Sequence, residues 1–177
     1  MDMSLHAFMD ESRRGSTYLV VVVFVRPRRL DLTRTALRRL VKPGQRRTHF
    51  KKEGDPRRRE IVARLHELGL RAMVWTCVHK DDVVVRQMCL AAVAVRLAEL
   101  GVAYFVVESC KHQDSLDRAT LAEVLGKNSE LTYGHLRPVE DPILWVSDAI
   151  AWCYGAGGDW RRRVSGLLDE VIALDGQ

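Results

Sequence analysis

The sequence has few cysteines, and none of them belongs to a metal-binding or disulfide pattern. Cys77, Cys89, Cys110 and Cys153 are scattered along the 177 residues, with no CxxC pair and no histidine at zinc-finger spacing. A disulfide-stapled secreted domain or a zinc finger would require a regular cysteine spacing. We therefore expect four reduced thiols, most of them buried.

The sequence also lacks a segment that could cross a membrane and a leader that would direct secretion. The most apolar run, residues 18–25, has eight residues, whereas a membrane-spanning helix needs about 20. The first residues contain no basic region followed by an apolar stretch and a cleavage site. These absences predict a cytoplasmic protein with no membrane partner.

Aromatic residues are scarce as well, at 7% of the chain, and no base-stacking motif stands out among them. Aromatic stacking is the main means by which proteins recognise unpaired bases. The aromatic content therefore favours neither RNA, DNA nor a hybrid as a partner.

What the sequence does contain is the pattern of one α/β domain spanning residues 1–177. Hydrophobic residues make up 47% and charged residues 29%, as in globular domains, and no repeat or long linker divides the chain. Apolar runs predict strands at 5–11, 18–25, 70–78, 102–108 and 131–136. Apolar residues at helical spacing predict helices at 31–41, 55–68, 83–100, 114–125 and 141–154, and a C-terminal helix at about 160–174 outside a core of about 5–154.

The basic residues are concentrated in one region. Residues 26–59 contain fourteen Lys and Arg against three acidic residues, a local charge of +11, while the remaining 14 basic and 20 acidic residues carry −6. Most of these cations are arginines, whose planar guanidinium suits phosphate oxygens. The region therefore predicts binding to nucleic acid, and the alternative is a solvated arginine-rich surface.

Two predicted strands end in carboxylates. The first ends at Asp10 and Glu11, and the strand of residues 102–108 ends at Glu108. Ligands of α/β sheets bind at the carboxyl ends of strands, so these side chains would converge if the two strands are neighbours. The alternative is that Asp10–Ser12 opens a solvated turn.

A further carboxylate, Asp148, occupies an apolar helix face. Its neighbours at three and four positions are Leu144, Trp145, Ala151 and Trp152. An unpaired carboxylate there would lose hydration, so it needs a basic side chain, hydrogen-bond donors or a metal. The alternative to a functional role is an Asp148 held by hydrogen bonds inside the fold.

Four carboxylates gathered at one point would form a site for divalent cations. Close carboxylates repel one another unless they are protonated or bridged by cations, and an all-oxygen ligand set favours Mg²⁺ or Mn²⁺. Such a site suits phosphoryl transfer, with two metal ions about 4 Å apart. The predicted ligands are Asp10, Glu11, Glu108 and Asp148.

Four short segments resemble the bacterial DUF3800 family. They are Phe8–Ser12, Thr48–Lys51, Val106–Ser109 and Leu144–Ala151. The resemblance runs from about residue 5 to residue 154, and it implies a ribonuclease H-like fold, a mixed sheet flanked by helices that begins with a hairpin. It also implies carboxylates on the first strand, the fourth strand and the last core helix, which are Asp10, Glu108 and Asp148 in this chain.

The chain departs from the family pattern at two places. Arg13 follows Ser12 where the family has glycine, and Arg47 and Thr48 replace an acidic residue. We choose Glu11 as the fourth ligand. Because successive strand residues point to opposite faces, this choice requires a bend at the end of the strand.

The basic region supplies the remaining candidates. His49 titrates near neutrality and is a candidate general acid or base, and the alternative is a surface loop with a capping role. Weaker candidates are His112, Asp114, Asp117 and His135. The predicted nucleic-acid-binding residues are Lys51, Lys52, Arg57, Arg58 and Arg59.

The sequence leads to a first interpretation and two alternatives. The first is a metal-dependent nuclease that hydrolyses phosphodiesters of RNA or DNA. The second is a non-catalytic nucleic-acid-binding or scaffold domain with the same fold, and metal binding separates the two. The third is an interaction module in which Trp145, Trp152 and Trp160 form an oligomer contact, such as that of a homodimer.

Overall fold

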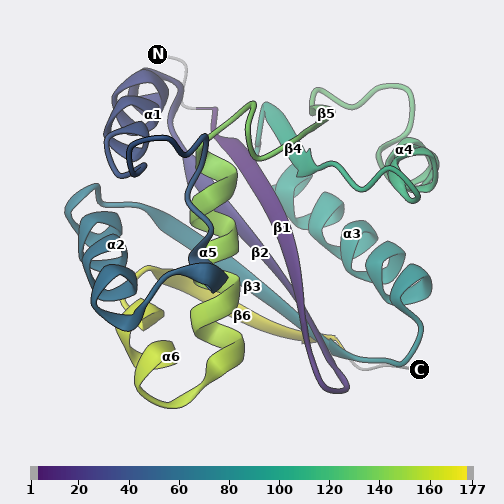
Figure 1. The fold of residues 1–177 in the computed structure, drawn as a ribbon. Coiled ribbons are helices and arrows are strands. Elements are labelled where there is room, and N and C mark those ends of the chain that lie inside the picture. The colour runs from purple at the N-terminus through teal and green to yellow at the C-terminus, as the bar shows by residue number, and fades with distance from the viewer. Residues whose placement is uncertain (1–3, 175–177) are drawn as a thin grey trace.

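The computed structural model describes residues 4–174, which form a six-stranded sheet with helices on both faces (Figure 1). The strands are β1 (His6–Arg14), β2 (Thr17–Val25), β3 (Arg71–Val78), β4 (Tyr104–Glu108), β5 (Thr132–Leu136) and β6 (Leu168–Leu174). The helices are α1 (Leu30–Arg38), α2 (Asp55–Glu67), α3 (Asp82–Glu99), α4 (Asp114–Leu125), α5 (Ile143–Ala156) and α6 (Gly158–Ser165), with 3-10 turns η1 (Pro27–Arg29) and η2 (Phe50–Lys52). The predicted strands and the first five predicted helices are confirmed, with shifts of a few residues at their ends.

The sheet is mixed, as predicted. Its strand order is β5-β4-β1-β2-β3-β6. β1, β2 and β3 are antiparallel neighbours, whereas β4 runs parallel to β1, β5 to β4, and β6 to β3. The central strands are therefore hydrogen-bonded to a neighbour on each side. Their side chains also pack in a core on each face of the sheet, which agrees with their near-continuous apolar sequences.

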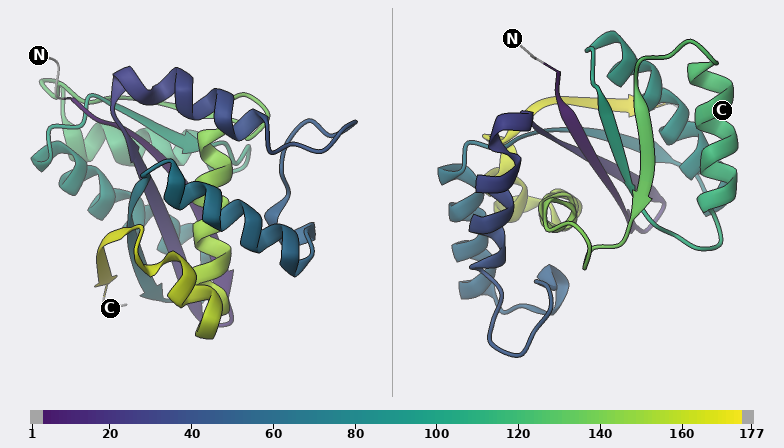
Figure 2. Two further views of the ribbon diagram at one scale, coloured as in Figure 1. Left: turned by 90° about the vertical axis from the view of Figure 1, so that its left-hand side faces the viewer. Right: turned by 90° about the horizontal axis from the view of Figure 1, so that it is seen from above.

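Two hydrophobic cores lie on the two faces of the sheet. Phe8 of β1 packs in the core that contains α1, α2 and α5, whereas its neighbours Ala7 and Met9 pack in the core that contains α3. This alternation is the two-residue period of a strand. Figure 2 shows α1, α2 and α5 on one side of the sheet and α3 and α4 on the other. Odd and even residues of β1 thus face different helices.

β1 is longer than the sequence indicated. It pairs with β2 in one unbroken register from His6 to Arg14, and the hairpin turns at Gly15 and Ser16. Gly15 has φ = +57°, a left-handed conformation that glycine adopts without strain. Asp10 therefore lies in the middle of a strand and not at its predicted end, and the alternative of a solvated turn at Asp10–Ser12 is wrong.

The predicted C-terminal helix at 160–174 is also wrong in its second half. α6 ends at Ser165, and β6 pairs in parallel with β3. Leu167, Leu168, Val171 and Ile172 have helical spacing, but without β6 the edge of β3 would leave its backbone groups unpaired. Tertiary pairing therefore overrides the local pattern, and the β-branched Val171 and Ile172 favour it.

Two other predictions concern thiols and membranes. All four cysteines are free, and Cys77, Cys89 and Cys153 are buried, as expected. Between residues 4 and 174, no helix combines the length and the apolar character that crossing a bilayer requires.

Candidate active site

The pairing of β1 with β4 brings two predicted carboxylates side by side. Met9 pairs with Val107 in this parallel ladder, so Asp10 and Glu108 follow as neighbours. Phe8, two residues before Asp10, packs in the core on the α5 side, so Asp10 faces α5 as well. A hydrogen bond joins the Asp10 and Glu108 side chains. The convergence inferred from the sequence is present where the pairing of β1 with β4 ends.

Asp148 lies near these two residues because a hydrogen bond holds α5 against β1. The Ser147 hydroxyl donates a hydrogen bond of 2.8 Å to the backbone carbonyl of Phe8, two residues before Asp10. The charge of Asp148 acts on Asp10, and that of Glu108 acts on Asp148. We call Asp10, Glu108 and Asp148 the α5-side cluster.

The α5-side cluster is poor in compensating positive charge. Asp10 is 6% exposed, and burial, followed by the hydrogen bond to Glu108 and the nearby carboxylates, raises its pKa well above the usual value. Burial and then the Glu108 charge raise the pKa of Asp148 to about 6, which the Arg47 charge and a hydrogen bond from the Phe50 backbone N–H offset only in part. Because burial and like charges both disfavour the ionised forms, a bound cation would be stabilised here.

Glu11 faces the other side of the sheet. β1 has no bend between Asp10 and Glu11, and the Glu11 carboxylate forms an ion pair with Arg86 of α3. Burial raises the pKa of Glu11, and the Arg86 charge opposes that rise. The structure thus brings three of the four predicted ligands together and pairs the fourth with an arginine.

Arg86 is a residue that the sequence reasoning missed. Its side chain is 0% exposed, and it donates hydrogen bonds to both carboxylate oxygens of Asp117 and, at 3.3 Å, to the backbone carbonyl of Glu108. Gln87 and His135 also bond Asp117, at 2.8 Å and 2.9 Å. We call Arg86, Glu11, Asp117, Gln87 and His135 the Arg86 network. The available signal was an arginine placed among the apolar residues of α3.

A second acidic group adjoins the Arg86 network. Oxygen and nitrogen atoms of Asp114, Asp117 and His135 lie within 4.8 Å of one another. Burial acts to raise the pKa of Asp117, but the hydrogen bonds from His135, Arg86 and Gln87 outweigh it and hold the pKa well below its usual range. Asp114 accepts hydrogen bonds from Ser109 and Cys110. These carboxylates are satisfied by protein donors, and the adjacent guanidinium would repel a cation.

His49 lies next to the α5-side cluster. It precedes Phe50, whose backbone N–H bonds Asp148, and its ring nitrogens are 3.1 Å and 3.3 Å from guanidinium nitrogens of Arg47. Burial, then the charges of Arg47 and Lys52, lower the pKa of His49. Its side chain makes no capping bond to η2 within the described chain. The lowered pKa favours the neutral imidazole, and the ring does not serve as a helix cap.

The predicted nucleic-acid-binding residues fall into two groups. The guanidinium carbon of Arg58 lies 4.0 Å from the centroid of the Trp152 ring, and the same side chain donates a 3.0 Å hydrogen bond to the Phe50 carbonyl. Arg57 donates a hydrogen bond to the Leu40 carbonyl and forms an ion pair with Glu60. These two arginines hold the segment before α2 in place, so their guanidinium groups already have protein partners, and their role in binding nucleic acid stays a prediction. The three that stay exposed, without an ion pair among residues 4–174, are Lys51, Lys52 and Arg59.

The three tryptophans pack against the core around α5, with Trp152 and Trp160 partly exposed, so they give no support to the alternative of an oligomer contact. Trp145 is buried and donates a hydrogen bond to the Pro138 carbonyl. The Trp152 ring packs edge-on against the rings of Phe50 and Trp160, with 5.5 Å between ring centroids in both pairs. These rings contribute to the core around α5.

No family model and no curated protein matches this chain. Among solved structures, it is similar to the RNase HII from Archaeoglobus fulgidus, in a complex with PCNA, with 19% identity and a TM-score of 0.59 over 92% of this chain and 76% of that chain. It is also similar to the ribonuclease H2 from Pyrococcus horikoshii OT3, with 15% identity and a TM-score of 0.58 over 92% of this chain and 75% of that chain. The likeness shows the fold, a ribonuclease H-like mixed sheet flanked by helices, as predicted.

Proposed function

We propose that this protein is a nuclease that hydrolyses phosphodiesters with divalent cations held by Asp10, Glu108 and Asp148. The observation that carries the proposal is the convergence of three carboxylates from β1, β4 and α5 at a point where burial and mutual repulsion are not offset by a paired cation. The likeness in fold to two ribonucleases supports the same class of reaction.

The residues of the α5-side cluster fit Mg²⁺ or Mn²⁺. All three offer carboxylate oxygens, which these hard cations prefer, and no cysteine or histidine side chain belongs to the cluster. The Asp114, Asp117 and His135 group fits less well, because its carboxylates already accept hydrogen bonds from neighbouring donors. The choice between Mg²⁺ and Mn²⁺ is left to experiment.

Each part of the chain has a stated task in this proposal. When bound, the cations would activate water and stabilise the leaving oxygen of the phosphodiester. Ser147 holds α5 against β1, and the Phe50 backbone N–H orients the Asp148 carboxylate. The neutral His49 imidazole accepts or donates a proton. Exposed cations beside it, at Lys51, Lys52 and Arg59, hold the nucleic-acid backbone.

Several finer expectations stay predictions. They are membership of the DUF3800 family, a cytoplasmic location and a ligand role for Glu11, whose pairing with Arg86 leaves it outside the proposed ligand set. The tryptophans pack against the core around α5 and give no support to a homodimer.

The test is cleavage of single-stranded RNA, single-stranded DNA and an RNA–DNA hybrid with Mg²⁺ or Mn²⁺. Glu108→Gln keeps the shape of the side chain and removes its charge, so cleavage should fall by about 100-fold or more while the protein stays folded. Glu123→Gln, at an exposed glutamate of α4, is the matched control.

A different result would favour the alternative function. If the wild-type protein binds nucleic acid but neither cleaves it nor is stabilised by Mn²⁺, the fold serves as a non-catalytic binding or scaffold domain. If Glu108→Gln retains wild-type cleavage, the reaction does not use the α5-side cluster.

A further inference from the structure

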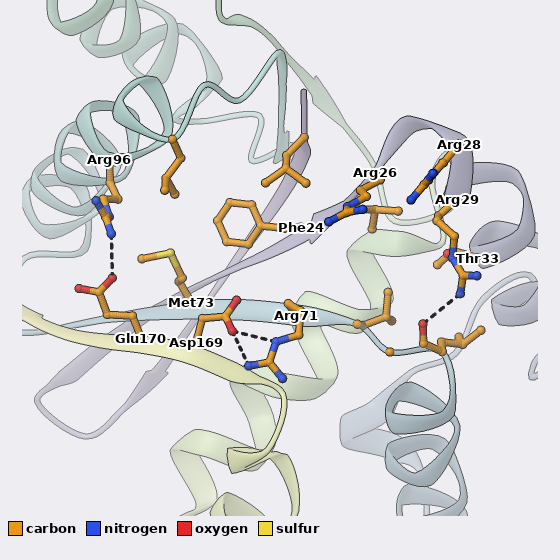
Figure 3. Close-up of a pocket in the computed structure, with 16 residues that line it drawn as sticks. Phe24, Arg26, Arg28, Arg29, Thr33, Arg71, Met73, Arg96, Asp169 and Glu170 are labelled. Carbon is orange, nitrogen blue, oxygen red and sulfur yellow. Dashed lines mark hydrogen bonds and ion pairs between the residues drawn. The ribbon is translucent and has the colours of Figure 1, made fainter. Parts of the chain in front are cut away.

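A concave site lies at the opposite end of the sheet from the α5-side cluster. This hollow, of about 760 Å³, opens where β1 and β3 begin and β2 ends, and Leu5, Phe24 and Met73 contribute to its lining (Figure 3). Leu5 and Asp10 are five residues apart along the same strand direction, which corresponds to roughly 17 Å. The hollow is therefore separate from the candidate active site.

The hollow carries an excess of positive charge. Five arginines and two acidic residues line it, for a net charge of +3. The acidic residues are both engaged, since Asp169 pairs with Arg71 and Glu170 pairs with Arg96. The remaining three cations are therefore not neutralised by the lining, and they are Arg26, Arg28 and Arg29.

Two of these three arginines have their guanidinium groups unused. Arg29 donates a hydrogen bond to the Leu68 carbonyl. Arg26 and Arg28 are exposed and form neither an ion pair nor a side-chain hydrogen bond with residues 4–174. An unpaired guanidinium presents a planar set of donors that matches phosphate oxygens. The two side chains thus offer two guanidinium groups for an anion on the short turn after β2.

The middle of the hollow is apolar. Figure 3 shows Phe24 and Met73 between Arg96 at one end and Arg26, Arg28 and Arg29 at the other. The Phe24 ring is half-buried, so part of its surface is available to a ligand. Aromatic rings and methionine sulfur both make favourable contacts with flat aromatic groups. A ligand that fits has an anion at one end and an aromatic ring in the middle.

We propose that this hollow binds a nucleotide, with its phosphate on Arg26 and Arg28 and its base against Phe24. The volume lies within the range of small-molecule sites, and the lining offers both chemistries that a nucleoside phosphate requires. The proposal goes beyond phosphodiester hydrolysis and does not depend on the α5-side cluster. The nucleotide is either free or a unit of a nucleic-acid strand.

Calorimetric titration of the full chain in EDTA tests this site with adenosine 5′-monophosphate, adenosine and inorganic phosphate as probes. The monophosphate should bind more tightly than either of its parts. Arg26→Gln with Arg28→Gln should weaken both phosphate-containing probes by about tenfold or more. Phe24→Leu should weaken the monophosphate by about tenfold and leave phosphate unchanged.

The matched control is Arg38→Gln with Arg39→Gln, which removes the same charge from the end of α1 outside the hollow and should leave the affinity unchanged. Absence of monophosphate binding, or an equal loss in the control, would overturn the proposal. So would equal affinity for monophosphate and phosphate. Competition by a short single-stranded oligonucleotide would identify the ligand as a unit of a strand, and its absence would identify a free nucleotide.

Because EDTA removes divalent cations, this result is independent of the proposed nuclease site. Glu108→Gln, which should abolish cleavage, should bind the monophosphate with wild-type affinity.

Discussion

The α5-side cluster and the Arg86 network lie on opposite faces of the same sheet, and they differ in how the negative charge of their buried carboxylates is compensated. In the network, the carboxylate of Asp117 is 0% exposed and accepts hydrogen bonds from an arginine, a glutamine and a histidine. In the cluster, Asp10 is 6% exposed and accepts a hydrogen bond of 2.7 Å from the Glu11 backbone N–H, but its side-chain partner is another carboxyl, that of Glu108, and not a cation. The comparison teaches that a carboxylate group with its donors in place is structural, whereas one without them is a candidate for binding a cation.

Glu108 connects the two regions. Its side chain belongs to the α5-side cluster, while its backbone carbonyl accepts a hydrogen bond from Arg86. The network therefore holds the end of β4, from which the cluster's central carboxylate projects. We expect damage to the network to lower stability and damage to the cluster to lower activity.

The largest effect on stability is expected from Arg86→Met. The substitution leaves the carboxylates of Glu11 and Asp117 buried without their cation, so the free energy of unfolding should fall by about 3–5 kcal/mol. Urea denaturation at pH 7 measures this change. Arg118→Met, at an exposed position of α4, is the control and should change stability by less than about 0.5 kcal/mol. A small loss for Arg86→Met would mean that the network is not structural.

The pH dependence of stability should separate the two regions next. The raised pKa values of Asp10 and Asp148 mean that the folded chain binds more protons than the unfolded chain near pH 5. In EDTA, the free energy of unfolding should therefore rise by about 1–3 kcal/mol as pH falls from about 7 to 5.

Asp117 predicts the opposite sign at lower pH. Its depressed pKa gives stability that is present above about pH 4 and is lost as the pH falls further. Denaturation curves from pH 7 to pH 3 should thus show a maximum near pH 4, about the pKa of an unfolded aspartate. A stability that falls steadily from pH 7 to pH 5 in EDTA would show that the α5-side cluster is not under-compensated.

The smallest effect on stability is expected from Glu11→Gln. This variant tests whether Glu11 belongs to the Arg86 network or to the α5-side cluster. Arg86 keeps Asp117 as a partner, so the loss of stability should be about 1–2 kcal/mol. The stabilisation by Mn²⁺ should change by less than about threefold in apparent affinity, because Glu11 faces away from the cluster. A loss of Mn²⁺ response as large as that of Glu108→Gln would restore Glu11 as a fourth ligand.

The three residues of the cluster could be predicted because each is a carboxylate in an apolar sequence. Asp10 and Glu108 follow continuous apolar strands, and Asp148 lies on an apolar helix face. Such placements are costly unless a partner exists, and this physical penalty is visible without a structure. The strands were predictable because strands buried on both faces have near-continuous apolar sequences. Their arrangement as a mixed sheet was implied by the family resemblance.

The rest depended on contacts between distant segments. Arg86 is 75 residues from Glu11 and 31 from Asp117, and no local pattern indicates that the three meet. Likewise, the partner of β6 is β3, nearly a hundred residues earlier, and only this pairing makes residues 168–174 a strand. Arg58 was predicted to bind phosphate from its charge and its basic neighbours. The sequence did not reveal that its guanidinium group lies over the Trp152 ring.

The most direct test of the central claim is the melting temperature of Asp148→Asn in EDTA and in Mn²⁺. Because Asp148 loses a charge that is poorly compensated, the variant should melt at or above the wild-type temperature in EDTA and gain less from Mn²⁺. If the variant instead melts well below wild type in EDTA, the Phe50 amide and Arg47 satisfy Asp148 as a structural carboxylate, and the account of the α5-side cluster as a cation site is contradicted.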